Sequence, residues 1–267
     1  MLAKLFLELT EFAFFRRLVW KPIYQFLAKR FANPDWHFMN YGYSPDDGNA
    51  QLSLVDTDEI NRYPIQLYHD LATKTEIENK DVLEVGSGRG GGAHFIMRYL
   101  KPRTMTGMDI ASNAVDFCNE QHKTPGLKYV TGNAESMPFA DNSFDVVINV
   151  ESSHAYGSVP QFLLEAKRVL RPGGIFLCTD MRDRDRIDML EQQMKDSGME
   201  LLQSINISGN VVKAIEMEDA IKKDRIAGQI PKKFRAAFEE FAGVKGSAIH
   251  EGLKNGNLVY KEFILRK

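Results

Sequence analysis

The sequence has little cysteine and almost no net charge. Only Cys118 and Cys178 occur among 267 residues, and they form no CxxC pair. It therefore predicts neither a disulfide framework nor a structural zinc site, and it fits a reducing cytoplasm. The 34 Lys and Arg residues nearly balance 36 Asp and Glu residues. Without a positive field that attracts phosphates, we expect no nucleic acid partner.

The sequence also lacks an uninterrupted apolar run long enough to cross a bilayer. The first 31 residues are rich in Phe, Leu and Trp, but Glu8, Arg16 and Lys21 interrupt them. This pattern is typical of neither a signal peptide nor a transmembrane helix. The apolar residues recur at three- and four-residue steps, which predicts two short amphipathic helices broken near Pro22. We favour packing of these helices on the protein over peripheral membrane contact through residues 1–31.

The length suits one α/β domain with additions, and 43% hydrophobic and 26% charged residues are ordinary for a globular protein. We expect N-terminal helices and a gate or lid over residues 1–56, followed by the main domain over residues 57–267. Oligomeric state does not follow from composition.

From residue 81 onward, short β-rich runs alternate with helical stretches, which predicts right-handed crossovers and a parallel sheet. Two later runs, 199–207 and 257–265, predict further strands, with a helical cap inserted between them at about 208–245. The first five predicted strands are residues 82–85, 104–109, 127–131, 144–150 and 174–179.

A glycine-rich turn follows the first of these strands. Gly86, Gly88 and Gly90 precede a helical stretch that starts near Ala93, and glycines there let a ligand approach the backbone closely. Because Gly86, Gly88 and Gly91 also satisfy the GxGxxG spacing of dinucleotide-binding folds, the spacing alone does not identify the ligand.

The residues around this turn resemble the class I S-adenosylmethionine (SAM)-dependent methyltransferases. Glu84 stands two residues before Gly86, at the position that lies near the methionine ammonium in that family. A carboxylate attracts that ammonium but repels a diphosphate, so Glu84 favours SAM over NAD. Asp109 ends the second strand, where an acid binds the ribose hydroxyls of either cofactor.

Three further segments resemble the family in the same order along the chain. Residues 132–139 resemble its GDAExLPF segment, with Asn133 in place of Asp; an amide oxygen can still accept from the adenine amine. Residues 143–149 and 169–174 resemble its fourth strand and the turn into its fifth. The resemblance implies a Rossmann-like, mostly parallel seven-stranded sheet with an antiparallel last strand. The cofactor-binding residues that it implies are Tyr43, Glu84, Gly86, Ser87, Gly88, Gly90, Asp109, Ile110, Asn133, Ala134, Glu135 and Asn149.

Within that family the chain resembles the phthiotriol and phenolphthiotriol dimycocerosate methyltransferases, which methylate lipid hydroxyls. The similarity is carried by the pair Asn61-Arg62 and by residues 67–69, 90–93 and 149–154. It implies a small lipophilic acceptor of lipid, polyketide-like or other secondary-metabolite type.

His154 is our candidate general base, because it follows the fourth strand at the edge where ligands of open α/β folds bind. A neutral imidazole suits proton removal near pH 7, and Glu151 could orient it or contact the acceptor. The alternative is that His154 only shapes the pocket. The other histidines have no metal-ligand spacing, so we expect no metal.

The turn-rich residues 33–56 predict a gate. Residues 40–43 resemble the aromatic segment that related enzymes fold over the cofactor's carboxylate end, with Tyr43 at the matching tyrosine; a turn packed by its own aromatics is the alternative.

Three other functions remain open at this stage. A carbon or nitrogen acceptor is compatible with SAM, and a non-catalytic SAM-binding protein would keep the same turn. An NAD-dependent oxidoreductase would need a relay such as YxxxK after the fourth strand, but Gly-Ser-Val-Pro follows Tyr156.

Overall fold

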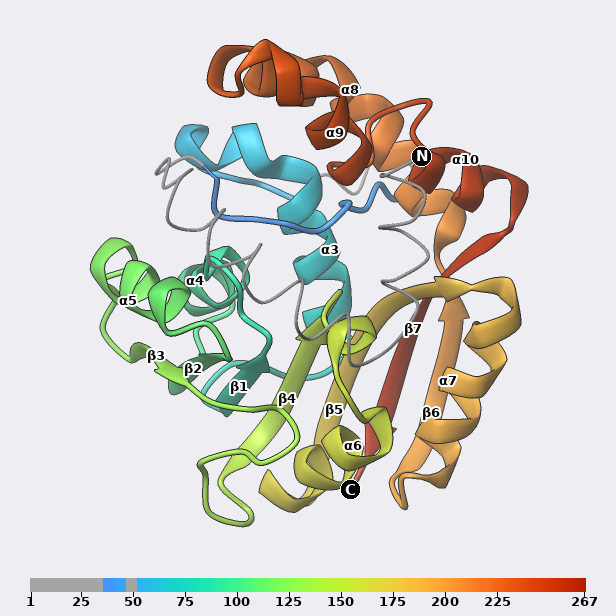
Figure 1. Cartoon of the computed structure of the whole chain (residues 1–267). Coiled ribbons are helices and arrows are strands. Elements are labelled where there is room, and N and C mark those ends of the chain that lie inside the picture. The colour runs from blue at the N-terminus through green and yellow to red at the C-terminus, as the bar shows by residue number, and fades with distance from the viewer. Residues whose placement is uncertain (1–35, 47–51) are drawn as a thin grey trace.

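The computed structural model describes residues 36–46 and 52–267. Within them, seven strands form one sheet in the order β3-β2-β1-β4-β5-β7-β6 (Figure 1). The pairs among β1 to β5 are parallel, whereas β7 is antiparallel to both β5 and β6. This confirms the predicted fold class. The strands are β1 (Asp81–Val85), β2 (Thr104–Asp109), β3 (Leu127–Thr131), β4 (Phe144–Val150), β5 (Leu170–Asp183), β6 (Glu200–Asn206) and β7 (Leu258–Arg266).

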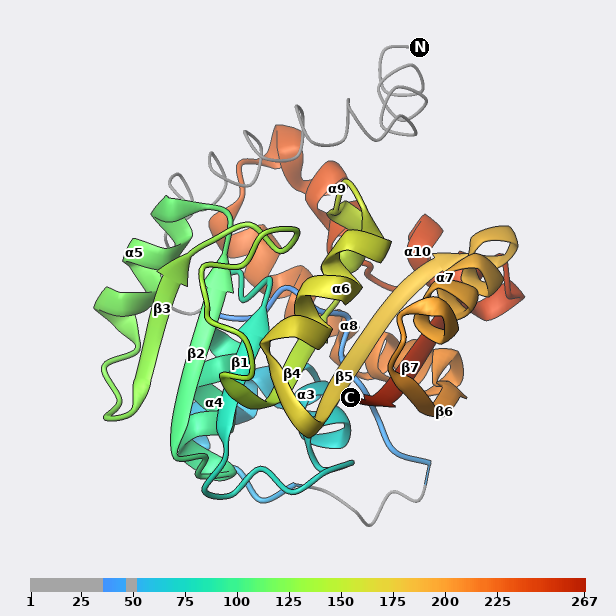
Figure 2. The same ribbon diagram turned by 90° about the horizontal axis from the view of Figure 1, so that it is seen from below.

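Helices cover both faces of the sheet (Figure 2). One face carries α3 (Arg62–Ala72), α4 (Gly91–Tyr99) and α5 (Ser112–Gln121), and the other carries α6 (Val159–Val169) and α7 (Arg184–Asp196). Two short 3-10 helices, η1 (Asp56–Asn61) and η2 (Ser153–Ala155), complete this part of the domain.

Three more helices lie between β6 and β7 in the chain: α8 (Ser208–Gln229), α9 (Lys232–Phe241) and α10 (Ala248–Asn255). The first two lie within the stretch predicted for the cap insertion, about 208–245, and α10 lies beyond it. In Figure 1, α8 and α9 lie above the sheet, on the side where the parallel strands end.

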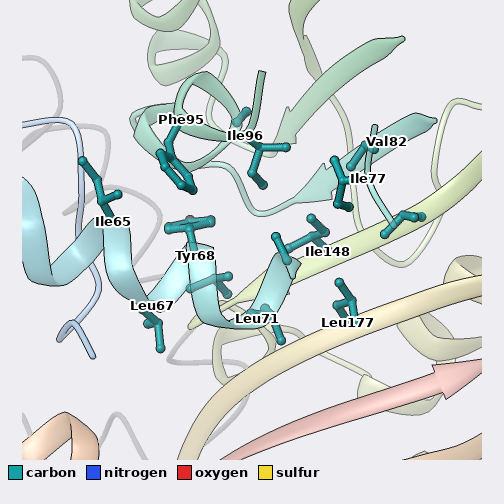
Figure 3. Close-up of a cluster of buried hydrophobic side chains, with 14 of the residues drawn as sticks. Ile65, Leu67, Tyr68, Leu71, Ile77, Val82, Phe95, Ile96, Ile148 and Leu177 are labelled. Atoms are coloured by element: carbon teal, nitrogen blue, oxygen red, sulfur yellow. The ribbon is translucent and has the colours of Figure 1, made fainter. Parts of the chain in front are cut away.

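The core explains why the central strands β1 and β4 are buried at almost every position. Since helices pack on both faces, β1 and β4 alternate between two cores and have no solvent face. Ile96 and Ile148 belong to the core under α3 and α4 (Figure 3), while Leu83 and Phe162 belong to the core under α6 and α7. The two cores hold the carboxyl ends of β1 and β4 in fixed positions.

The fifth strand is longer than the predicted residues 174–179. Strand β7 pairs with β5 from Ile175 to Asp183, so the ladder continues past Thr179. This extension places Asp180 in a strand.

The predicted gate falls partly within the described residues. Residues 36–46, called the strap below, and residues 52–55 contain no helix or strand. The amphipathic helices expected within residues 1–31 lie outside the described residues. Among the residues that the structure describes, no helix has both the length and the apolar character needed to cross a membrane.

A close contact between α3 and α4 leads to a first prediction. A Cβ built on Gly92 would lie 2.1 Å from Cε1 of Tyr68, so Gly92→Ala must displace a buried ring. We expect the variant to lose about 1–3 kcal/mol in the free energy of unfolding, measured by urea denaturation.

The control is Gly228→Ala in the last turn of α8, where a Cβ would meet nothing within 4 Å. It should keep or slightly raise stability, by at most about 1 kcal/mol. Equal stability of the two variants would show that the contact between the two helices is not tight.

Candidate active site

The glycine-rich turn connects β1 to α4 and lies beside the segment that follows β4. A Cβ on Gly86 would lie 2.3 Å from Oγ of Ser152, whereas one on Gly88 would meet only Sδ of Met39, at 3.9 Å. The first glycine is thus required by the close approach of the two loops. The second leaves backbone that a ligand can reach.

Glu84 is a fully buried carboxylate at the carboxyl end of β1. Its Oε1 accepts a hydrogen bond of 2.6 Å from the Tyr68 hydroxyl, and burial raises its pKa to about 8. Its Oε2 and the Oγ of Ser87 are buried atoms without a hydrogen-bond partner among the described residues. Buried polar groups are normally paired, so these two atoms fit a ligand with a cationic or donor group.

Asp109 joins the end of β2 to the glycine-rich turn. Its Oδ2 accepts from the Gly88 amide at 2.8 Å and its Oδ1 from the Ala111 amide at 2.9 Å. Burial raises the pKa of this carboxyl group. Its neighbour Ile110 is 44% exposed. Each carboxylate oxygen can accept further hydrogen bonds, as binding of ribose hydroxyls requires.

The predicted adenine-binding residues form a turn after β3. The Oδ1 of Asn133 accepts from the Glu135 amide at 3.1 Å, and Oε1 of Glu135 accepts from the Gly157 amide at 2.9 Å. Ala134 is buried between them. The turn after β3 is thereby attached to the loop that follows β4.

Asn149 lies at the end of β4, where the strand order reverses between β1 and β4. Its buried amide nitrogen lies within hydrogen-bond distance of three acceptors, which share its two hydrogens: the Val85 carbonyl at 2.9 Å, Ser152 Oγ at 2.7 Å and the Tyr156 hydroxyl at 2.9 Å. Asn149 therefore cross-links the two loops, and the structure brings the predicted residues of β1, β2, β3 and β4 to one edge of the sheet.

Tyr43 is a predicted residue that the structure does not bring to Glu84. Its ring packs against the core below α3, and burial together with the neighbouring Asp70 and Glu262 raises the pKa of its hydroxyl. The tyrosine at Glu84 is Tyr68, which the sequence marked only as part of a shared motif.

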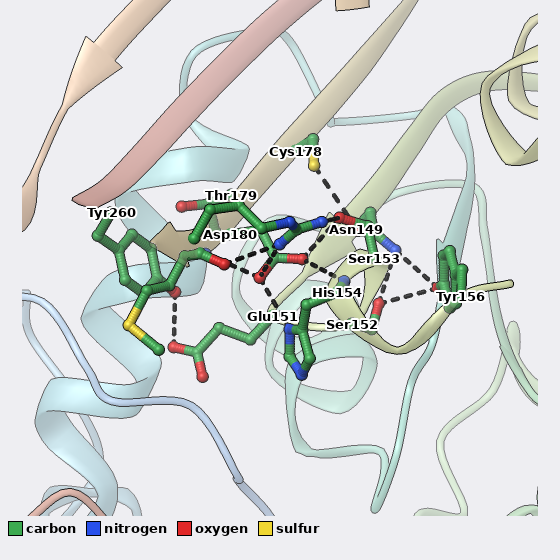
Figure 4. A network of polar contacts seen from close by, with 12 residues as sticks. Asn149, Glu151, Ser152, Ser153, His154, Tyr156, Cys178, Thr179, Asp180 and Tyr260 are labelled. Atoms are coloured by element: carbon green, nitrogen blue, oxygen red, sulfur yellow. Dashed lines mark hydrogen bonds and ion pairs between the residues drawn. The ribbon is translucent and has the colours of Figure 1, made fainter. Parts of the chain in front are cut away.

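His154 lies on η2 and is oriented by an aspartate that sequence reasoning missed. Its Nδ1 is 2.9 Å from Oδ1 of Asp180 (Figure 4), and 43% of its side chain is exposed. Asp180 is fully buried; it also accepts from Ser153 Oγ at 2.6 Å and pairs with Arg182 at 3.1 Å. Burial alone would raise the pKa of Asp180, but Arg182 and His154 outweigh it and hold the pKa well below its usual range.

Two roles are open to Glu151, orienting His154 or contacting the acceptor, but the partner of His154 Nδ1 is Asp180 and not Glu151. Its Oε1 accepts from the Tyr260 hydroxyl at 2.5 Å (Figure 4). It also accepts from the Tyr41 amide of the strap at 2.8 Å. Burial raises its pKa to about 7, and its φ of 45° marks a sharp turn after β4. Its carboxylate therefore joins three segments: the strap, β7 and the end of β4.

The strap passes over the glycine-rich turn. The His37 carbonyl accepts from the Gly91 amide at 3.2 Å, and the Trp36 carbonyl accepts from the Arg89 guanidinium. At its other end, the Ser44 amide donates a hydrogen bond of 3.1 Å to the Asn210 carbonyl of α8. The strap therefore links the turn to the helices above it.

Comparisons with known proteins agree with this geometry. A family model described as a methyltransferase domain matches residues 83–178. The chain is 41% identical over 230 residues to a fatty-acid O-methyltransferase of Mycolicibacterium smegmatis, covering 82% of this chain and 84% of that protein. It is 37% identical over 249 residues to a phthiotriol/phenolphthiotriol dimycocerosates methyltransferase of Mycobacterium tuberculosis, covering 93% and 92%.

Solved structures share the fold. The [4+2]-cyclase SpnF superposes with a TM-score of 0.69 at 21% identity, covering 92% of this chain and 94% of its own. The geranyl diphosphate C-methyltransferase of Streptomyces coelicolor, solved with Mg²⁺, geranyl diphosphate and S-adenosyl-L-homocysteine, superposes with a TM-score of 0.65 at 15% identity, covering 91% and 97%.

Glu84 leads to a second prediction. With a pKa of about 8 it is mostly protonated at pH 7, and the ammonium of S-adenosylhomocysteine should drive it into the ionised form. We expect binding at pH 7 to release close to one proton. Calorimetric titration in phosphate and in Tris, which differ in ionisation enthalpy, measures this release.

The control is Glu84→Gln, which cannot titrate and should bind without the release. Equal binding enthalpies of the wild type in the two buffers would contradict the prediction.

Proposed function

The chain belongs to the class I SAM-dependent methyltransferases, in the family of the fatty-acid and phthiotriol dimycocerosates methyltransferases, and from this we propose that it methylates a hydroxyl oxygen of a lipid-like acceptor. It is a SAM-dependent enzyme, so the alternatives of an NAD-dependent oxidoreductase and of a non-catalytic binding protein no longer apply.

The cofactor supplies an electrophilic methyl group on a sulfonium. In this proposal Glu84 binds the ammonium end, Asp109 binds the ribose, and Asn133 accepts from the adenine amine. The first of these roles is supported by the buried Oε2 of Glu84, which has no partner in the described part of the chain. The partly exposed backbone at Gly88, with room for a Cβ, supports close approach of the ligand between them.

The observation that carries the acceptor proposal is the contact between His154 and Asp180. The Nδ1 of His154 faces Asp180, so a proton placed there would leave the imidazole lone pair on Nε2, which can then remove the hydroxyl proton. Asp180 would stabilise the imidazolium that forms. A carboxylate acceptor is already ionised and needs no such base, so the pair favours a hydroxyl.

The lipid character of the acceptor rests on the relatives and on apolar side chains near the strap. Both relatives described above carry lipid substrates in their names. Met39 of the strap is 42% exposed beside Gly88, and Met217 of α8, which contacts Ser44 of the strap, is 51% exposed. Flexible methionines suit a lipophilic chain. Glu151, bound between the strap and β7, would contact the acceptor near its reacting end.

The third prediction tests the base. With SAM and a long-chain secondary alcohol, His154→Ala should lower kcat by about 10²- to 10⁴-fold, and Asp180→Asn by at least about tenfold, because Asn favours the wrong imidazole tautomer. Product mass spectrometry identifies the methylated atom and separates an oxygen from a carbon or nitrogen acceptor.

Asp141→Asn is the control, because it removes an exposed aspartate that pairs with Arg168 at 2.8 Å and precedes β4, at the opposite end of the strand from His154. All variants should retain S-adenosylhomocysteine binding, which shows that they fold. Methylation of a free fatty acid at an undiminished rate by His154→Ala, with no alcohol product from the wild type, would overturn the hydroxyl proposal and leave the methyltransferase assignment intact.

A further inference from the structure

Tyr68 is held rigidly between two helices and the strap. It projects from α3 toward Phe95 and Ile96 of α4 (Figure 3) and is only 7% exposed. The absence of a side chain at Gly92 makes room for its ring, and the ring of Phe38 in the strap lies 6.0 Å from it. The ring therefore has a single position, and its hydroxyl points to one place.

That place is Glu84. The hydroxyl donates a hydrogen bond of 2.6 Å to Oε1, and burial together with Glu84 raises the pKa of Tyr68 well above its usual value. Tyr68 is thus always a donor. Oε1 is occupied in this way, and Oε2 is the carboxylate oxygen without a partner in the described part of the chain.

We propose that Tyr68 is a cofactor-positioning residue: its hydroxyl holds one oxygen of Glu84 so that the other faces the ammonium group of SAM. The matched domain begins at residue 83, so this role belongs to a helix that precedes it. The proposal rests on the SAM cofactor and not on the identity of the acceptor, so failure of either proposal leaves the other testable.

A role in packing alone would depend on the ring and not on the hydroxyl. The fourth prediction therefore uses Tyr68→Phe, which keeps the ring against Gly92. We expect it to weaken S-adenosylhomocysteine binding by about tenfold, the usual size of a lost hydrogen bond to a charged group. Binding of 5′-methylthioadenosine, which has the adenosyl part but no ammonium, should change less than about twofold. Isothermal titration calorimetry measures both.

A proton count provides a second readout. The hydrogen bond from Tyr68 lowers the pKa of Glu84 against the larger effect of burial, so its loss should raise that pKa further. At pH 8, where Glu84 of the wild type is about half ionised, Tyr68→Phe should release more protons on binding than the wild type does.

The matched control is Tyr99→Phe. Tyr99, the last residue of α4, donates a hydrogen bond of the same length, 2.6 Å, to Asp58 of η1 and not to Glu84. It should leave both affinities unchanged. In a double-mutant cycle, Tyr68→Phe should cause little further loss when Glu84 is already Gln. Equal weakening of both ligands, no weakening of either, or full additivity with Glu84→Gln would overturn the proposal.

Discussion

The hydrogen bond from the Asn149 amide to the Val85 carbonyl is the contact on which the site depends, because it ties the carboxyl end of β4 to that of β1. The loop after β1 is the glycine-rich turn, and the loop after β4 carries Glu151 and His154. Both loops leave the sheet where its strand order reverses, which is where an open α/β sheet leaves a crevice. The Asn149 amide is buried and lies within hydrogen-bond distance of three acceptors in these loops. Movement of either loop would therefore break a buried contact.

The site also contains three buried carboxyl groups whose pKa values are shifted in different directions. Burial raises the pKa of Glu84 to about 8 and that of Glu151 to about 7, whereas Asp180 is kept ionised by Arg182. The three carboxyl groups thus differ in charge at neutral pH although they lie toward the same edge of the sheet. Such separation of pKa values is typical of functional sites, since a purely structural carboxylate is normally paired or exposed.

Much of the fold and part of the site could be predicted from the sequence, because they depend on local patterns. Strand runs, the glycine-rich turn and the acids at strand ends are encoded within a few residues of one another. Side-chain partners across the fold are not. The strap and α3 carry four tyrosines. Tyr68 is the one whose ring packs against Gly92 and whose hydroxyl reaches Glu84, and this packing cannot be read from the sequence. Asp180 was missed because the antiparallel pairing with β7 extends β5 beyond its apolar run.

The position of β7 affects the order in which the sheet can form during synthesis. This strand is the last of the sheet along the chain, yet it lies between β5 and β6, and its Tyr260 bonds to Glu151. A ribosome that has released β1 to β6 therefore exposes a nascent chain with an open edge on β5 and an unpaired β6. Glu151 gains its Tyr260 partner only when residues 258–266 emerge, so newly made chains complete this part of the site in a late step of synthesis.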